Sequence, residues 1–194
     1  EDMLPQFLGG CQIGDLVYAD TNNAGIVDNQ DKLQIGNVHP RVSLGIDLDL
    51  QYKGWGLYLL GVSELGLDVL KNTNYYFNRG EEKYSVIALE RYHPENNPEG
   101  TYPRLTTLTG ENNAVPSTFW MENGSYFRLK NMELSYTFTF RKNNSVVKSL
   151  KLFGRGTNLF VISKIKELDP ENLTAGIANY PLYRTFTGGV SINF

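Results

Sequence analysis

The sequence of 194 residues contains a single cysteine, Cys11, and only two histidines, His39 and His93. One cysteine cannot build a disulfide framework within the chain or a metal site that needs several thiolates. A serine nucleophile paired with histidine would require a strained Gly-x-Ser-x-Gly turn, and the sequence has none. We therefore expect that the protein is not an enzyme.

Positive charge and long hydrophobic runs are also scarce. The formal net charge is −3 at pH 7, so the basic surface of a nucleic-acid-binding protein is missing and we expect no nucleic-acid partner. No stretch reaches the roughly 18 consecutive apolar residues that a membrane helix requires. Residues 1–5 lack the basic and apolar regions of a signal peptide, so we expect either a mature start or a piece of a longer protein.

Aromatic residues and glycine, in contrast, are abundant. The 12 Tyr, 10 Phe and 2 Trp argue against disorder, and the 19 Gly argue against long helices. In residues 41–50, apolar side chains occupy every second position and polar side chains lie between them. This alternation is typical of a strand with one apolar and one polar face.

Similar alternation predicts an all-β protein built from antiparallel strands. The expected strands are residues 41–50, 55–65, 126–140, 147–160 and 184–194. Their connections are alternately short (51–54 and 141–146) and long (66–124 and 161–183). Tight periplasmic turns and long extracellular loops give transmembrane β-barrels this pattern. Asp47 and Asp49 also fit a hydrated barrel lumen better than a sandwich core, where an unpaired charge is costly.

Seven groups of short strings follow one another along nearly the whole chain: Gly14–Asp20 with Gly25, Asp28 and Ile35–Asn37; Tyr52–Gly54; Tyr92–Asn96 with Tyr102–Leu105; Glu122–Asn131; Asn158–Phe160; Leu168–Glu171; and Arg184–Gly189 before Phe194. Taken together and in this order, they resemble the SusC/RagA family of TonB-dependent outer-membrane transporters of Bacteroidetes. The run from Asn123 to Asn131 is the most specific of them.

This resemblance implies that the chain is the C-terminal segment of a large outer-membrane β-barrel of about 22 strands, which five or six strands cannot close. The implied regions are an extracellular region with a strand (1–40), a hairpin (41–65), a long extracellular loop (66–124), a second hairpin (125–160), an extracellular loop (161–183) and a terminal strand (184–194). The implied function is import of glycans or oligopeptides across the cell outer membrane. The implied partners are the plug and N-terminal barrel strands and a SusD-like lipoprotein.

Two other functions stay open at the sequence level. One is a soluble β-sandwich that binds carbohydrate through aromatic loops, and the other is a glycoside hydrolase that uses a pair of loop carboxylates. Detergent dependence would separate the sandwich from the membrane barrel.

Residues 20–31 have the spacing of a calcium-binding loop. Asp20, Asn22, Asp28 and Asp31 would supply oxygen ligands, and Gly25 would sit at the sharp turn. Ala24 offers no ligand at the fifth position, and Asp31 replaces the usual longer glutamate. The alternative is a turn in which these side chains bind their own backbone, which needs no cofactor.

Three loop residues and the last residue complete the candidate sites. Tyr102 and Trp120 could stack on sugar faces, and Arg104 could bind a carboxylate, although a loop core would use the same residues. The last strand has apolar residues at alternate positions and ends in Phe194. Because outer-membrane barrels resemble one another in this ending, Phe194 is predicted to be an assembly signal.

Overall fold

The computed structural model describes Gln6 and residues 11–78, 80–81, 83–107, 112–140, 146–173, 178 and 180–194. These residues hold seven strands and four 3-10 helices. No helix among them is long and apolar enough to cross a membrane. The chain divides into a sheet unit (37–68, 123–171 and 180–194) and a loop unit (1–36, 69–122 and 172–179). The expected all-β, antiparallel architecture is confirmed.

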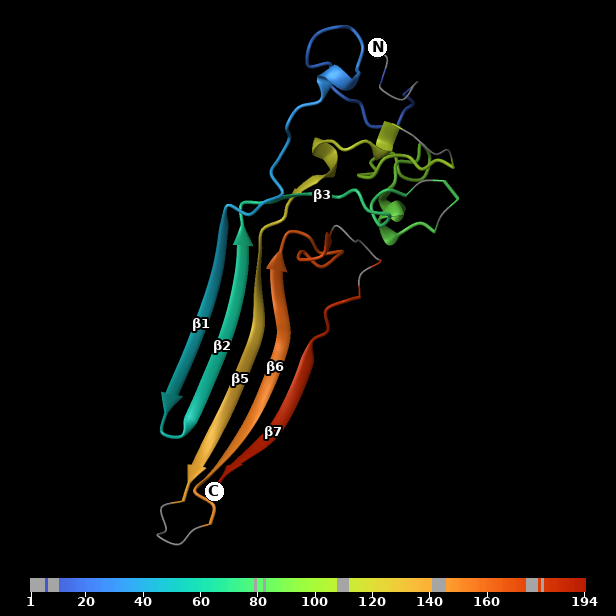
Figure 1. Cartoon of the computed structure of the whole chain (residues 1–194). Helices are drawn as coiled ribbons and strands as arrows, with labels where there is room; N and C mark the ends of the chain where they lie inside the picture. Colours follow the sequence, from blue (N-terminus) through green and yellow to red (C-terminus); the bar gives the residue numbers. More distant parts are fainter. Residues whose placement is uncertain are drawn as a thin grey trace. The chain divides into compact units, whose positions relative to one another are not determined.

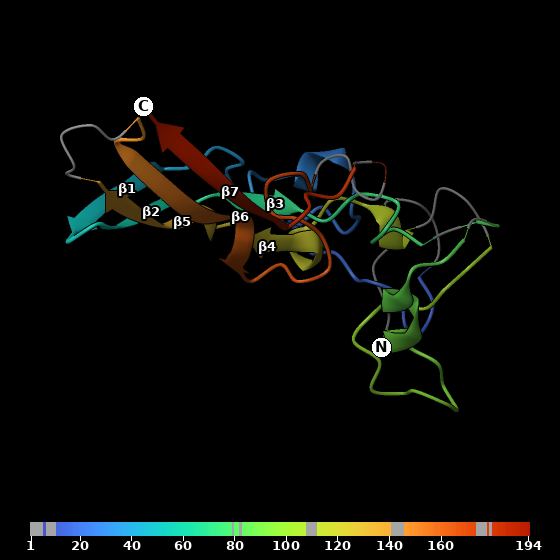
Figure 2. The ribbon, with the colours of Figure 1, turned by 90° about the horizontal axis from the view of Figure 1, so that it is seen from below.

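The sheet unit is built on five long strands in the order β1-β2-β5-β6-β7, which can be followed in Figures 1 and 2. The strands are β1 (Val42–Tyr52), β2 (Trp55–Leu65), β5 (Tyr126–Thr139), β6 (Ser149–Ser163) and β7 (Thr185–Asn193). Neighbouring strands pair antiparallel throughout. Within the described residues the sheet is not closed into a barrel, and β1 and β7 are its two edges.

A two-residue turn joins β1 to β2. Lys53 and Gly54 both have positive φ, at 47° and 89°, and Tyr52 pairs with Trp55 across the turn. Two successive positive φ angles match the twist of a tight hairpin, and glycine takes the second position without strain. Thr137 of β5 donates its N–H to the Gly54 carbonyl at 2.8 Å, so the turn is also fixed to the next strand.

The strand register separates the two faces of the sheet along its whole width. One row across the sheet consists of Leu48, Leu59, Met132, Gly156 and Phe186. The adjacent row on the opposite face consists of Asp49, Tyr58, Glu133, Arg155 and Thr187. Because cross-strand partners in an antiparallel pair lie on the same face, the alternation seen in the sequence becomes one apolar and one polar surface.

The sheet unit has little hydrophobic core of its own. Its buried apolar residues within the described chain are Leu67, Tyr126 and Ile165, which lie at or beyond strand ends. In a soluble sandwich the central strand positions would be buried against a second layer. Here most apolar strand side chains are exposed instead, including Leu48, which is 39% exposed, and Ile46, which is 56% exposed.

The loop unit has an aromatic core. Trp120 is buried, and the rings of Phe77, Tyr102 and Phe119 pack edge-on against it with centroids 4.9, 5.7 and 4.8 Å away. Four 3-10 helices lie in this unit: η1 (Asn29–Asp31), η2 (Val86–Glu90), η3 (Asn112–Ala114) and η4 (Thr118–Trp120). Two short strands, β3 (Asp68–Leu70) and β4 (Met121–Asn123), form a second sheet. The described residues of segment 66–124 are therefore folded rather than structureless.

The strand expected within residues 1–40 does not occur in the part of that region that the structure describes. Gln6 forms a bridge, and residues 11–40 contain turns and η1. Residues 1–5 and 7–10 lie outside the described residues. The local reason is the density of Asp and Asn in residues 20–31, whose side chains hydrogen-bond to nearby backbone and so favour turns over a strand ladder.

Candidate functional site

The apolar face of the sheet exposes many large hydrophobic side chains. It carries large side chains from all five strands, among them Leu44, Leu50, Leu134, Leu152, Phe160 and Val190. Soluble monomers rarely expose a contiguous apolar patch beyond a few hundred Å². A surface of this kind needs an apolar environment, and the hydrocarbon core of a membrane supplies one.

Aromatic side chains gather at the end of this apolar face that carries the β1–β2 turn. Tyr52, Trp55 and Tyr136 are cross-strand neighbours in one row, and the Trp55 and Tyr136 rings pack edge-on at 4.9 Å. Phe138 packs on Tyr136 at 4.7 Å. Aromatic rings in a row beyond an apolar band are typical of a membrane interface.

The polar face carries a group of paired charges. The carboxylate of Glu133 accepts hydrogen bonds from Lys151 Nζ at 2.8 Å and from Arg155 Nε at 3.0 Å. These residues and Asp49 line a hollow of about 720 Å³ on the same face. Asp47 and Asp49 alternate with apolar residues in β1, and both lie on this polar face of the sheet. Their position agrees with the expectation that these carboxylates do not belong in an apolar core.

A second ionic cluster lies near the start of β5. The side chain of Arg128 is only 4% exposed, and it reaches Asp169 Oδ1 at 2.6 Å and Glu171 Oε1 at 2.8 Å. Lys130 Nζ binds the other Glu171 oxygen at 2.8 Å. The segment after β6 is thereby held to β5 by two cations and two carboxylates, and we call these four residues the Arg128 cluster.

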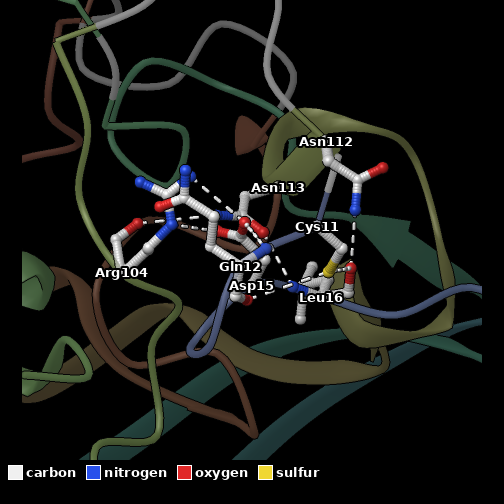
Figure 3. A network of polar contacts seen from close by, with 7 residues as sticks. All are labelled: Cys11, Gln12, Asp15, Leu16, Arg104, Asn112 and Asn113. Carbon is white, nitrogen blue, oxygen red and sulfur yellow. Dashed lines mark hydrogen bonds and ion pairs between the residues drawn. The ribbon is translucent and has the colours of Figure 1, made fainter. Parts of the chain in front are cut away.

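In the loop unit, a polar network is centred on Asp15 (Figure 3). Its carboxylate, with the side chain 2% exposed, lies 2.6 Å from Arg104 Nε and accepts hydrogen bonds from Asn113 Nδ2 and the Gln12 N–H. Asn113 also accepts the N–H of Leu16 at 2.8 Å. The network joins residues 12–16 to Arg104 and Asn113, which lie 89 positions after Asp15 and 97 positions after Leu16.

Close packing and burial support the same network. A Cβ added to Gly14 would lie only 2.2 Å from Tyr92 Cδ1, and Gly14 has a φ of 92°, so glycine is required there. Tyr18 donates its hydroxyl to the Asn112 carbonyl. Burial raises the pKa of Tyr18 to about 12, so its hydroxyl stays protonated at physiological pH.

The predicted calcium ligands all accept hydrogen bonds from the chain itself. Asp20 accepts from the N–H groups of Ala24 and Gly25, and Asn22 also accepts from that of Ala24. Asp28 caps η1, and the Asp28 N–H donates to Asp31. This hydrogen bond is the main cause of the lowered pKa of Asp31. Among the described residues no group of three or more His, Cys, Asp or Glu side chains is arranged to hold a metal ion. Calcium binding at residues 20–31 stays a prediction.

The three predicted ligand-binding residues are engaged within the loop unit. Tyr102 and Trp120 are both buried, with Tyr102 Oη donating to the Tyr76 carbonyl at 2.6 Å and Trp120 Nε1 to the Asn113 carbonyl at 2.9 Å. Burial also raises the pKa of Tyr102. Arg104 binds Asp15. The structure thus brings Tyr102 and Trp120 together in the aromatic core, and their role in ligand binding stays a prediction.

Phe194 follows the last residue of β7 and is 66% exposed. Asn193 accepts the Lys148 N–H at 2.8 Å, so the chain end is paired up to its penultimate residue. Figure 1 places the chain end at the same end of the sheet as the β1–β2 turn. The assembly role of Phe194 stays a prediction.

The sequence alone did not identify the Asp15 network or the Arg128 cluster as sites, although their charged residues lie within the family-like strings. Gly14–Asp20 and Tyr102–Leu105 are separate family-like strings, and Asp15 and Arg104 meet. Glu122–Asn131 and Leu168–Glu171 are likewise separate, and they are joined through Arg128 and Glu171. The available signal was that the two strings of each pair contain residues of opposite charge.

Comparisons with known proteins give one consistent result. The chain is similar to the TonB-dependent receptor P26 of Formosa agariphila, with 32% identity over 208 residues that cover 98% of this chain and 20% of the relative. It is also similar to the TonB-dependent receptor SusC of Bacteroides thetaiotaomicron, with 28% identity over 92% of this chain and 17% of SusC. The chain thus spans about a fifth of the length of the curated relatives it matches. No family model matches.

Solved structures show the same fold. The RagAB peptide importer in its open-open state matches 81% of this chain and 17% of the solved chain, with a TM-score of 0.60 and 23% identity. The closed-closed state of RagAB matches with a TM-score of 0.61 and 21% identity, over 83% of this chain and 18% of the solved chain. The five-stranded sheet accordingly has the architecture of part of a larger barrel.

Proposed function

Because this chain belongs to the TonB-dependent receptors of the SusC/RagA type, we propose that it forms part of the barrel wall of an outer-membrane nutrient importer. Proteins of this family reside in the cell outer membrane and are receptors and transporters rather than enzymes, so the glycoside hydrolase alternative is set aside. The cargo we propose is a glycan or an oligopeptide.

The observation that carries the proposal is the separation of the two sheet faces. The apolar face, with side chains such as Ile46 and Leu134 exposed, suits contact with lipid, and the polar face, with Asp49 and the charges around Glu133, suits a wet lumen. A soluble carbohydrate-binding sandwich would bury the apolar face against a second sheet.

Site-directed spin labelling of neighbouring β1 positions tests this proposal in the full-length receptor in outer membranes. A label at Leu48→Cys should collide with dissolved oxygen, which enters lipid, and a label at Asp49→Cys should collide with a water-soluble nickel chelate. Equal exposure of both labels to the nickel chelate, in a receptor that stays monomeric without detergent, would support the soluble sandwich instead.

The proposed partners are the remaining barrel strands with the plug and a SusD-like lipoprotein. The open edges β1 and β7 are where further strands would pair, because each carries unpaired backbone groups. We place the lipoprotein contact on segment 66–124, whose exposed side chains include Val86 and Leu89 on η2. Photo-crosslinking from Val86 in cells tests this contact, with Lys53 in the β1–β2 turn as the control position; crosslinks from Lys53 alone would contradict it.

A further inference from the structure

A pocket of about 410 Å³ is lined only by residues of the loop unit. Its apolar walls come from Ile13, Pro94 and Leu105, and its polar groups come from Arg91, His93 and Arg104. None of these residues is used by the barrel wall described above. The pocket thus combines a small apolar space with nitrogen donors.

The polar groups differ in how much charge they can offer a ligand. Arg104 is paired with Asp15, so its charge is compensated. Arg91 donates to the Ala88 carbonyl at 3.3 Å and forms no ion pair with an acid in the described part of the chain. Its guanidinium, which has five N–H donors, is therefore the uncompensated cation of the pocket.

His93 supplies a second donor among the residues that line the pocket. Its Nδ1 accepts the N–H groups of Asn96 at 3.1 Å and Glu95 at 3.3 Å, so the ring proton lies on Nε2. An imidazole N–H and a guanidinium that line the same pocket suit the two oxygens of a carboxylate, which accepts several hydrogen bonds at once.

Backbone hydrogen bonds hold these groups in place before any ligand arrives. Tyr92 donates its N–H to Tyr102 at 2.7 Å, and His93 exchanges two hydrogen bonds with Asn97 at 2.9 and 3.0 Å. Arg104 donates its N–H to Gly14 at 2.9 Å. A site whose frame is already formed loses less entropy on binding.

We propose that this pocket binds the carboxylate of an organic acid that carries an apolar group, with Arg91 and His93 on the carboxylate and the apolar group between Ile13 and Leu105. The inference rests on the proposed import function and deepens it by naming a carboxylate as a chemical feature of the ligand that the loop unit binds. It concerns a binding site and needs no transport step.

The test uses the purified full-length receptor in detergent and three probes, which are N-acetylphenylalanine, its neutral amide and galacturonate. Calorimetry should show binding of the acid and at least tenfold weaker binding of the amide. Arg91→Gln should weaken binding of the acid by about tenfold to a hundredfold, the loss expected for a hydrogen bond to a charged group. Arg91→Lys keeps the positive charge but loses the paired N–H donors of the guanidinium. Its affinity for the acid should lie between those of the unchanged receptor and Arg91→Gln.

The control variant is Lys83→Gln, which removes an exposed cation from the same unit outside the pocket. It should bind the acid as the unchanged receptor does. The proposal is overturned if Arg91→Gln binds the acid normally, if acid and amide bind equally, or if galacturonate, which lacks an apolar body, binds as tightly. Because binding is measured without transport, such a failure leaves the barrel proposal to its own spin-label test.

Discussion

Replacing Arg128 should release the segment that follows β6. Arg128→Met keeps much of the side-chain length but removes the cation that Asp169 and Glu171 share, and Lys130 alone cannot compensate both carboxylates. Breaking a buried ion pair by removing one partner costs about 3–5 kcal/mol. The two carboxylates are 25% and 18% exposed, so water offsets part of the loss and we expect about 3 kcal/mol.

That cost is measurable as local opening. A loss of about 3 kcal/mol corresponds to a roughly 150-fold larger open population, since each 1.4 kcal/mol is a factor of ten. Hydrogen–deuterium exchange of the full-length receptor in detergent should therefore show faster exchange in residues 164–171, while the centre of β2 stays protected. Unchanged exchange in residues 164–171 would refute the conclusion that the Arg128 cluster holds this segment to β5.

Two further variants test whether burial of the cation and the loss of charge compensation set this cost. Arg155→Met removes a cation that is 51% exposed and also paired with a carboxylate, Glu133, so it should cost less than about 1 kcal/mol. Adding Asp169→Asn and Glu171→Gln to Arg128→Met should restore part of the lost protection, because the variant then has no uncompensated carboxylate. Equal effects of Arg128→Met and Arg155→Met would show that burial does not set the cost.

Four other outcomes are expected of the full-length receptor. Leu134→Arg on the apolar face should lower stability by about 2–4 kcal/mol near mid-bilayer, whereas Thr137→Lys on the polar face should be mild; equal tolerance in urea unfolding would argue against a membrane-facing surface. Deleting Phe194 should reduce the amount of receptor assembled in the outer membrane without weakening cargo binding by the assembled molecules, and the reverse result would contradict an assembly role. Millimolar calcium should raise the melting temperature only if residues 20–31 bind it, and Asp31→Asn should abolish any such rise. Because the pKa of Tyr18 is raised from 10.0 to about 12, its contribution to stability is complete below pH 10 and is lost as the pH rises through 12, so Tyr18→Phe should flatten the fall in melting temperature over that range.

The sequence by itself determined the strands and their faces. Side chains alternate along a strand with a period of two, so Leu48 and Asp49 must lie on opposite faces whatever the rest of the chain does. The β1–β2 turn was equally local, because Lys53 and Gly54 lie at the boundary between two alternating runs. Family-like strings then indicated the barrel. These features depend on neighbours a few residues apart, which a single sequence contains.

Only the tertiary structure decided which distant residues meet. Arg128 lies more than 40 positions before Asp169 and Glu171, and Asp15 lies 89 positions before Arg104. Nothing in a local pattern selects one carboxylate among the 21 acidic residues, because the choice depends on the path of the chain and on which charges lose water together. The same reason explains Trp120. Its aromatic character was plain in the sequence, but its burial depends on rings brought from residues 77 and 102.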